Sequence, residues 1–298
     1  MNKLEHKALL DAQVHFGHLK RKWNPKMLPY IFGEKKGIHI IDLNRTSEKL
    51  EEAAQAAKAI ARSGRKIMFV ATKKQAKEVV KEAAKRTGMP FVTERWLGGM
   101  LTNFTTIRKS IKKMQSIEKM LQDGTLESVT KKEKLVLTRE KEKMEKVLGG
   151  VSAMNRVPAA LFLVDIMHEN IALKEAQRLN INTIGLVDTN SDPTRVDFAI
   201  PANDDAATSI AIITNYIADA IAECLAERAA SQDGTENSES EEDNTDNNQF
   251  DAEVTDEEKG KRDGDRGGRK RSTGNTGGGA GKGRARIGGG TGGPKKTV

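Results

Sequence analysis

Short apolar runs alternate with amphipathic segments along most of the chain. The apolar runs lie at residues 38–43, 66–72, 91–93, 160–165, 183–187 and 198–200. Helical patterns cover residues 4–13, 47–63, 74–86, 170–179 and 206–228. Short continuous apolar strands that are joined by helices are typical of a parallel sheet covered on both faces. The pattern therefore predicts a doubly wound α/β fold.

A different pattern interrupts this alternation between two Leu-Gly-Gly triplets, at residues 97–99 and 148–150. The first half carries apolar residues at spacings of three and four, the seam of a helix that packs on one partner: Ile107, Ile111, Met114, Ile117 and Leu121. Asp123-Gly124 breaks the pattern, and Leu137, Met144 and Leu148 resume it, with Lys141 interrupting the seam. Residues 105–148 are therefore predicted to form an antiparallel coiled-coil hairpin, inserted into an α/β domain made of residues 1–104 and 149–230.

The C-terminal segment has too few aliphatic residues to build a core. Residues 231–258 form an acidic tract, and residues 259–298 are rich in Gly, Arg and Lys. Chains of this kind cannot offset the entropy of ordering, so both tracts are predicted to be disordered.

The remaining body of the chain is basic. The whole chain carries +8, and the C-terminal segment holds twelve basic and fourteen acidic residues, so residues 1–230 carry +10. Such a body indicates a polyanionic partner or an acidic membrane surface. A membrane is disfavoured because no apolar run approaches the roughly 20 residues that span a bilayer. The single cysteine, Cys224, excludes a disulfide framework and fits a reducing cytoplasm.

Two basic segments carry the chemistry expected of RNA binding. In the first, four cations surround an indole: Lys20, Arg21, Lys22, Trp23 and Lys26. Cations neutralise phosphates, and an exposed ring can stack on a base, although Trp23 could instead be buried with the cations around it. The second set lies at the start of the hairpin: Arg95, Trp96, Asn103, Arg108, Lys109, Lys112 and Lys113. Its alternative interpretation is a solubilising helix face, with Asn103 acting as a helix cap.

Ligands of such sheets bind at the carboxyl ends of the strands, so a catalytic or metal-binding set would lie there. An enzyme would most readily use Asp165, His168 and Asp188, but no nucleotide-binding glycine motif or zinc-protease motif is present. We therefore predict no catalytic residue, no cofactor and no small-molecule substrate. Five residues could meet as a metal site if their loops are adjacent: His18, Asp188, Asp192, Asp204 and Asp205. The alternative is that these acids cap loops, with Asp204 capping the last helix.

Three long segments resemble one known family. They are HFGHLKRKWNPKMLPYIFGEKKGIHIIDL, RWLGGMLTNFTTIRKSI and PAALFLVDIMHENIALKEAQRLNINTIGLVDTNSDPTRVDFAIPANDDA, which resemble bacterial small-subunit ribosomal protein two over about residues 4–229. The resemblance implies a flavodoxin-like domain with a protruding coiled coil, without catalytic activity, in the cytoplasmic ribosome. It also implies contacts with small-subunit rRNA and neighbouring ribosomal proteins near the head-body junction, including ribosomal protein one where that protein is present.

The resemblance makes the two basic segments rRNA-facing regions, whereas a free RNA-binding protein would use the same segments without a ribosome. The chain departs from the family pattern after about Ser231, where it adds the acidic tract and the Gly/Arg/Lys tract. These tracts could serve as an assembly or tethering arm, or be a solvated extension.

Overall fold

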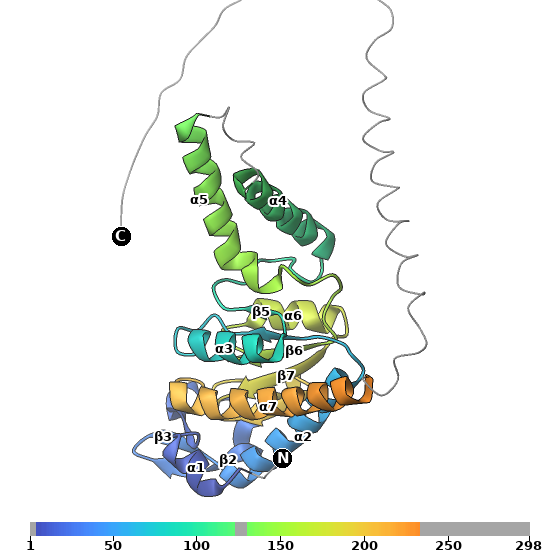
Figure 1. Ribbon diagram of the computed structural model, residues 1–298. Helices are drawn as coiled ribbons and strands as arrows, with labels where there is room; N and C mark the ends of the chain where they lie inside the picture. The colour runs from blue at the N-terminus through green and yellow to red at the C-terminus, as the bar shows by residue number, and fades with distance from the viewer. Residues whose placement is uncertain (1–3, 123–129, 233–298) are drawn as a thin grey trace, which may run out of the picture. The chain divides into compact units, whose positions relative to one another are not determined.

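The computed structural model describes residues 4–122 and 130–232. Its central feature is a five-stranded parallel sheet (Figure 1). The strands are β4 (Ile67–Val70), β5 (Phe91–Val92), β6 (Ala160–Val164), β7 (Asn182–Val187) and β8 (Phe198–Pro201). Their spatial order is β5-β4-β6-β7-β8, the flavodoxin-like order in which the second strand lies outside the first. The predicted doubly wound, flavodoxin-like fold is therefore confirmed.

Helices cover both faces of this sheet because successive side chains of a strand point to opposite faces. Ile67 and Phe69 of β4 belong to a core shared with α2 (Leu43–Arg62), α3 (Lys77–Thr87) and α7 (Ala207–Gln232). Met68 and Val70 of the same strand belong to a second core, shared with α6 (Asn170–Arg178) and the base of the helical hairpin. The β strands are thus buried from both sides, which explains their unbroken apolar runs.

Helix α7 is unusually apolar for a surface helix. Residues Ala207–Ala230 are long and apolar enough to cross a membrane by length and composition, contrary to the expectation that no apolar segment has the length of a span. However, Ile210, Ile213, Ile217 and Ile221 are fully buried in the core shared with α2 and α3. The composition of α7 is that of a core helix, which makes it weak support for a membrane span.

The N-terminal part forms a separate antiparallel sheet. After α1 (His6–Asp11), strands β1 (Phe16–Leu19), β2 (Ile31–Lys35) and β3 (Ile38–Ile41) pair in the order β1-β3-β2. The 3-10 turns η1 (Lys20–Lys22) and η2 (Pro25–Tyr30) lie between β1 and β2, and a third, η5 (Pro193–Arg195), precedes β8.

The prediction that residues 38–43 form a strand of the parallel sheet is therefore wrong. β2 and β3 are joined only by Lys36 and Gly37, whose φ angles of 55° and 78° are those of a tight hairpin turn. A connection this short permits only antiparallel pairing, since a parallel pair needs a crossover. The following helix begins earlier than predicted, at Leu43, because the Asp42 carboxylate accepts the Asn44 N–H at 2.9 Å and caps it.

The inserted hairpin consists of α4 (Phe104–Gln122) and α5 (Lys131–Leu148), which pack on each other as predicted. The expected seam residues Ile107, Ile111, Met114 and Ile117 are buried. Lys141 does not disrupt the seam, because its ammonium group pairs with Glu118 at 2.8 Å. The predicted break at Asp123-Gly124 lies outside the described residues, as do residues 233–298 of the two C-terminal tracts.

The second Leu-Gly-Gly triplet closes the hairpin against β5. Gly150 lies in the 3-10 turn η4 (Gly149–Val151), where an added Cβ would overlap the Phe91 backbone oxygen. The residue at this position must therefore be glycine for α5 to return to the sheet. In Figure 1 the hairpin extends on the side of β5 and α6, and the antiparallel sheet lies on the side of α2.

Candidate nucleic-acid interface

The carboxyl ends of all five parallel strands lie at one edge of the sheet, which we call the carboxyl edge. Strand β1 and the segment that follows it are both attached to this edge through Thr189, just after β7. The Thr189 side-chain oxygen accepts the His18 N–H at 2.8 Å, and its carbonyl accepts the Asn24 N–H at 2.8 Å. Gly17 allows the approach, since an added Cβ would lie 2.6 Å from the Thr189 side chain. The first basic segment is therefore placed beside β7 and β8.

We call residues 20–26 the basic loop. Lys20 pairs with Glu34 at 2.7 Å, and Lys26 pairs with Asp192 at 2.7 Å. Arg21 and Lys22 are exposed and form no ion pair within the described part of the chain. Trp23 is half-buried, with its ring 5.2 Å from that of His39. The loop thus offers two cations that form no ion pair among the described residues, beside a partly accessible indole. Trp23 is neither a fully exposed stacking ring nor a fully buried one.

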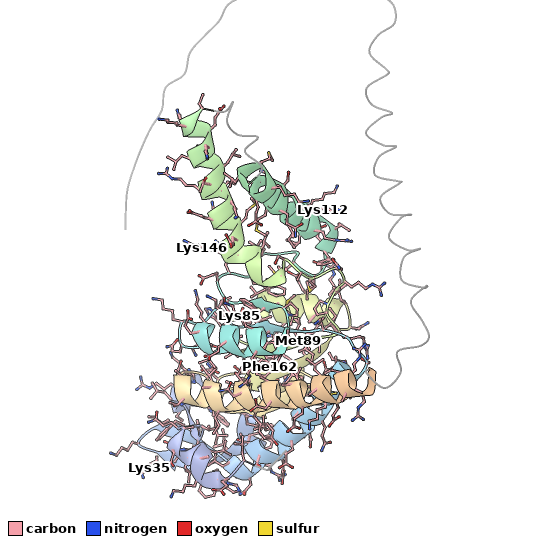
Figure 2. All side chains as sticks on the ribbon, in the orientation of Figure 1. Lys35, Lys85, Met89, Lys112, Lys146 and Phe162 are labelled. Atoms are coloured by element: carbon pink, nitrogen blue, oxygen red, sulfur yellow. The ribbon has the colours of Figure 1, made fainter. Side chains whose placement is uncertain are left out.

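The second basic set lies on α4, and we call Arg108, Lys109, Lys112 and Lys113 the arm root. All four side chains are exposed. Lys113 pairs with Glu140 of α5, whereas Arg108 and Lys109 form no ion pair among the described residues. Figure 2 shows side chains projecting from both helices of the hairpin, with Lys112 labelled on α4 and Lys146 on α5. The arm root is therefore a basic surface that acids of the chain compensate only in part.

Three further residues of the second set lie between the sheet and α4. Arg95 is exposed at the end of β5. The exposed Asn103 accepts the Thr106 hydroxyl at 2.8 Å, so its side chain is used at the start of α4. Trp96 is only 6% exposed, and its indole N–H donates to Glu175 at 3.1 Å. The prediction that Trp96 adds an exposed stacking ring to this surface is therefore wrong, because the ring belongs to the second core.

The buried Glu175 carboxylate of α6 organises the whole Leu-Gly-Gly loop. It accepts the backbone N–H groups of Gly99, Leu101 and Thr102 at 2.8, 2.9 and 3.2 Å, in addition to the indole. Gly99 adopts a φ of 86°, which lets the chain curl around the carboxylate at low steric cost. Burial would raise the pKa of Glu175, but these hydrogen bonds together lower it below its ordinary value.

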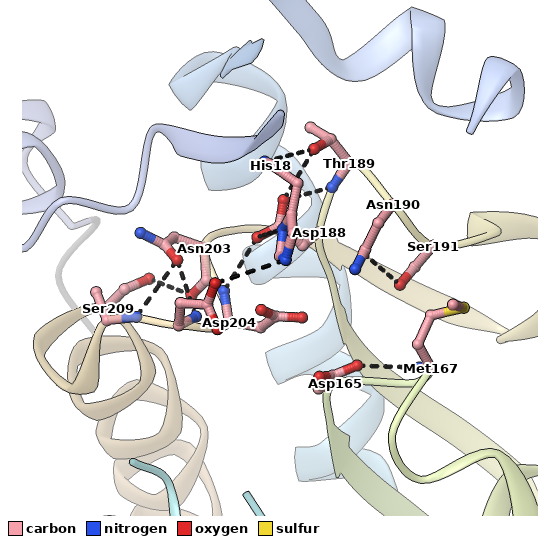
Figure 3. Close-up of polar contacts among 12 residues, drawn as sticks. His18, Asp165, Met167, Asp188, Thr189, Asn190, Ser191, Asn203, Asp204 and Ser209 are labelled. Atoms are coloured by element: carbon pink, nitrogen blue, oxygen red, sulfur yellow. Dashed lines mark hydrogen bonds and ion pairs between the residues drawn. The ribbon is translucent and has the colours of Figure 1, made fainter. Parts of the chain in front are cut away.

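The acidic residues at the carboxyl edge do gather, together with His18 (Figure 3). His18 Nδ1 lies 3.0 Å from Asp188, and His18 Nε2 lies 3.5 Å from the exposed Asp205. Asp204 completes a group with His18 and Asp188 whose potential ligand atoms lie within 4.8 Å of one another. Asp192 does not join them, because it binds Lys26 and the Thr194 N–H. Four of the five residues that the sequence left open as a metal site are thus adjacent.

A lysine that no sequence motif marks as functional lies in the same cluster. The Lys73 ammonium group is 2.8 Å from Asp204, 2.6 Å from Asp205 and 3.4 Å from Asp165. Burial raises the pKa of Asp204 to about 7, helped by the charges of Asp188 and Asp165. Burial alone would lower the pKa of Lys73, but its bonds to Asp204 and Asp205 raise it instead. The Lys73 ammonium group therefore already supplies positive charge to these carboxylates. His18 and the adjacent carboxylates are side chains of the kind that bind zinc.

Side chains of these loops also hold the backbone before α7 and after β6 and β7. The turn before α7 is held by Asn203, whose side-chain oxygen accepts the Asp205 and Ala206 N–H groups at 2.9 and 3.3 Å, while the Asp204 carboxylate pairs with Lys73. The prediction that Asp204 caps this helix is therefore wrong. Asp165 and Asp188, the carboxylates that an enzyme would use, accept backbone N–H groups of their own loops, from Met167 and Thr189 respectively (Figure 3). Both carboxylates therefore stabilise the backbone conformation of the loops in which they lie.

The sequence can also be compared with known protein families. The family model described as Ribosomal protein S2 matches residues 9–224. The chain belongs to the ribosomal protein S2 family. It is 65% identical to small ribosomal subunit protein uS2 of Cytophaga hutchinsonii over 215 residues, which cover 72% of this chain and 85% of that protein. It is 59% identical to the uS2 protein of Flavobacterium johnsoniae over 219 residues, covering 74% of this chain and 86% of that protein.

Membership of the ribosomal protein S2 family gives the general function. The chain is a structural protein of the small ribosomal subunit in the cytoplasmic ribosome and takes part in translation. The family is a structural family without an enzymatic role. The resemblance inferred from the three sequence segments is thereby confirmed.

Proposed function

We propose that the chain binds small-subunit rRNA near the head-body junction through the basic loop and the arm root, and that this binding supports subunit assembly. The supporting observation is a set of exposed cations that make no ion pair within the described residues: Arg21, Lys22, Arg95, Arg108 and Lys109. Cations that are not neutralised within the protein are available for phosphate oxygens, and planar guanidinium groups suit bidentate contacts.

The two surfaces are held apart by the rigid sheet. The basic loop is fastened beside β7 and β8, while Arg95 and the arm root follow β5 at the opposite end of the sheet. Two RNA elements bound at a fixed separation reinforce each other, because the second contact forms within the first complex. The sheet thus acts as a spacer in this proposal.

Salt dependence tests the arm root. We expect the double substitution Arg108→Ala and Lys109→Ala to weaken binding of the full-length chain to small-subunit rRNA. The slope of log affinity against log salt should fall by about 1.4–1.8, since each lost phosphate contact removes about 0.7–0.9. The control is Lys35→Ala with Lys85→Ala, which removes the same charge from other elements (Figure 2). Equal slopes for the two double variants would contradict the role of the arm root.

We also propose that neighbouring ribosomal proteins, including ribosomal protein one where present, dock on the antiparallel sheet. Phe16 and Leu19 of β1 pair with Ile40 and Ile38 of β3 and are 42% and 53% exposed. Phe32 of β2 is 80% exposed. Apolar side chains gathered on one small sheet indicate a protein-binding surface.

The substitution Phe32→Ser tests this second contact. Burying a phenylalanine contributes about 1.5–3 kcal/mol, so we expect capture of purified ribosomal protein one by the full-length chain to weaken about tenfold or more. Leu179→Ser, at a 41% exposed position after α6, is the control and should leave capture unchanged. An equal loss of capture with both variants, or with neither, would refute the assignment to β2.

A further inference from the structure

A cavity of about 310 Å³ opens at the carboxyl edge where β4 and β6 lie side by side. Helices α3 and α6, which follow these two strands, cover opposite faces of the sheet, so their connections diverge at this point. Doubly wound folds bind ligands in such a crevice. Its walls come from three strand ends: Thr72 after β4, Arg95 and Trp96 after β5, and His168 and Glu169 after β6.

The buried wall of the cavity carries a carboxylate with unused bonding capacity. Glu169 is only 3% exposed, and its Oε1 accepts both the N–H and the O–H of Thr72 at 2.6 Å. Its Oε2 has no hydrogen-bond partner within residues 4–122 and 130–232. Burial raises the pKa of Glu169, against the opposing effect of the Thr72 bonds. Glu169 Oε2 is not one of the fully enclosed unpartnered atoms, so it is open to the cavity, where a ligand that donates a hydrogen bond can take the place of water.

The other walls favour a flat, partly apolar group. Trp96, of which only 6% is exposed, and the 57% exposed Ile171 are the apolar residues of the lining. Arg95 and His168 are exposed at the same cavity and can face an anion. Glu94 is already compensated, because it pairs with Lys77 at 2.8 Å. The volume is at the lower end of the roughly 300–1,000 Å³ of small-ligand sites, enough for one ring system.

We infer that this cavity receives one unpaired rRNA nucleobase bearing an exocyclic amino group, which donates a hydrogen bond to Glu169 Oε2 while Arg95 contacts an adjacent phosphate. Sequence-specific RNA recognition commonly takes unstacked bases into such sites. Cytosine has the required amine, whereas uracil presents carbonyl oxygens on both sides of its single N–H and would repel a carboxylate. The inference rests on the proposed rRNA binding and adds base selectivity to it.

A lysine or arginine side chain from a neighbouring protein is the competing occupant. Its donors would also satisfy Glu169, but its charge would approach Arg95 and would be placed against the apolar surface of Trp96 and Ile171. A neutral base next to a phosphate matches all of these groups, so the walls favour RNA.

The chain supplies its own reporter for the test. Trp23 and Trp96 are the two tryptophans, so the full-length Trp23→Phe variant leaves Trp96 as the only indole emitter. In this background we expect cytidine monophosphate to quench Trp96 emission at about tenfold lower concentration than uridine monophosphate, the effect of one hydrogen bond to a charged group. Glu169→Gln should abolish the difference, whereas the control Glu94→Gln should retain it.

A second variant covers the case in which Glu169→Gln does not fold. Ile171→Glu changes an exposed side chain in the first turn of α6, where a carboxylate is compatible with the helix dipole, and should block the cavity by repelling the phosphate. Equal quenching by the two nucleotides, or cytidine monophosphate binding that survives Ile171→Glu, would overturn the inference. Quenching by methylguanidinium but not by the nucleotides would also overturn it, in favour of a cationic side chain.

The rRNA affinity and its salt dependence distinguish the contact in the cavity from the contact at the arm root. Glu169→Gln should lower rRNA affinity about tenfold without changing the salt slope, because Glu169 contacts no phosphate in the inferred complex. Arg108→Ala with Lys109→Ala should change the slope and leave nucleotide selectivity intact. If the arm-root variant behaves as expected but Glu169→Gln leaves rRNA affinity unchanged, the cavity inference fails while the proposed function stands. If the arm-root slope is unchanged, the proposed arm-root contact fails by its own test.

Discussion

Replacing Glu175 with alanine is expected to destabilise the full-length chain by about 3–5 kcal/mol. The substitution removes the common acceptor of the Trp96 indole and three backbone N–H groups. Each buried donor left without an acceptor costs about 1–3 kcal/mol, part of which incoming water restores. Because these donors hold the loop that leads into α4, the arm root should also lose its fixed position.

Urea unfolding with fluorescence detection measures this effect, and a red shift of Trp96 emission should accompany it as water reaches the ring. Lys174→Ala, at the neighbouring exposed position of α6, is the control and should change stability by no more than about 0.5 kcal/mol. A loss below about 1 kcal/mol for Glu175→Ala would show that the loop is held by other contacts.

The stability that Glu175 contributes should decrease in acid. The pKa of Glu175 is lowered in the folded chain, so the unfolded state binds a proton first as the pH falls. The stabilisation is therefore complete above the unfolded value of 4.5 and is lost as the pH falls through the folded pKa. The stability difference between wild type and Glu175→Ala should narrow in that acid range.

Replacing Lys73 with methionine is expected to cost about 3–5 kcal/mol at pH 8, the penalty for leaving buried carboxylates without their cation. Lys73 is the shared partner of Asp204, Asp205 and Asp165, and Asp204 is fully buried. Without the ammonium group, Asp204 and the equally buried Asp188 would face each other with their repulsion less compensated.

The cost of Lys73→Met should be smaller at pH 5.5 than at pH 8. The folded pKa of Asp204 is about 7, above its unfolded value of 3.8, so folding favours its protonated form. Its unfavourable contribution therefore grows as the pH rises from about 4 to 7, and removing the cation extends this range upward. Below pH 7 a proton can replace the lost ammonium group.

Urea unfolding at both pH values tests this, in buffer containing a chelator so that no metal ion replaces the ammonium group. Lys74→Met is the matched control, because Lys74 is exposed and forms no ion pair within the described chain; it should change stability by no more than about 0.5 kcal/mol. An identical cost for Lys73→Met at both pH values would contradict the role of Asp204 protonation.

The fold was largely predictable because its determinants are local in sequence. Unbroken apolar runs such as residues 160–164 reflect burial on both faces, and the seam that begins at Ile107 reflects one packed helix face. The antiparallel sheet was missed because β1 has only four residues and two 3-10 turns separate it from β2. Pairing between such short strands depends on tertiary contacts, including the attachment to Thr189.

The site was less predictable because its determinants are distant in sequence. Glu175 resembles an ordinary polar residue of an amphipathic helix, and its donors lie more than 70 positions away along the chain. Lys73 resembles one of several surface lysines until the ends of β6 and β8 are placed beside it. Trp96 was predicted to be exposed because cations lie next to it in the sequence, whereas packing in the second core buries its ring.

The attachment of the α4–α5 hairpin should allow this hairpin to be exchanged between related ribosomal proteins. Ile107 near its start and Leu148 at its end share one apolar cluster, and Gly150 returns the chain against β5. The sheet therefore meets this segment as a single paired junction, whatever its length beyond that point. A hairpin transplanted from a related protein should be accepted if Glu175, the first glycine triplet and Gly150 are kept, so that reach and surface charge can be altered without redesigning the domain.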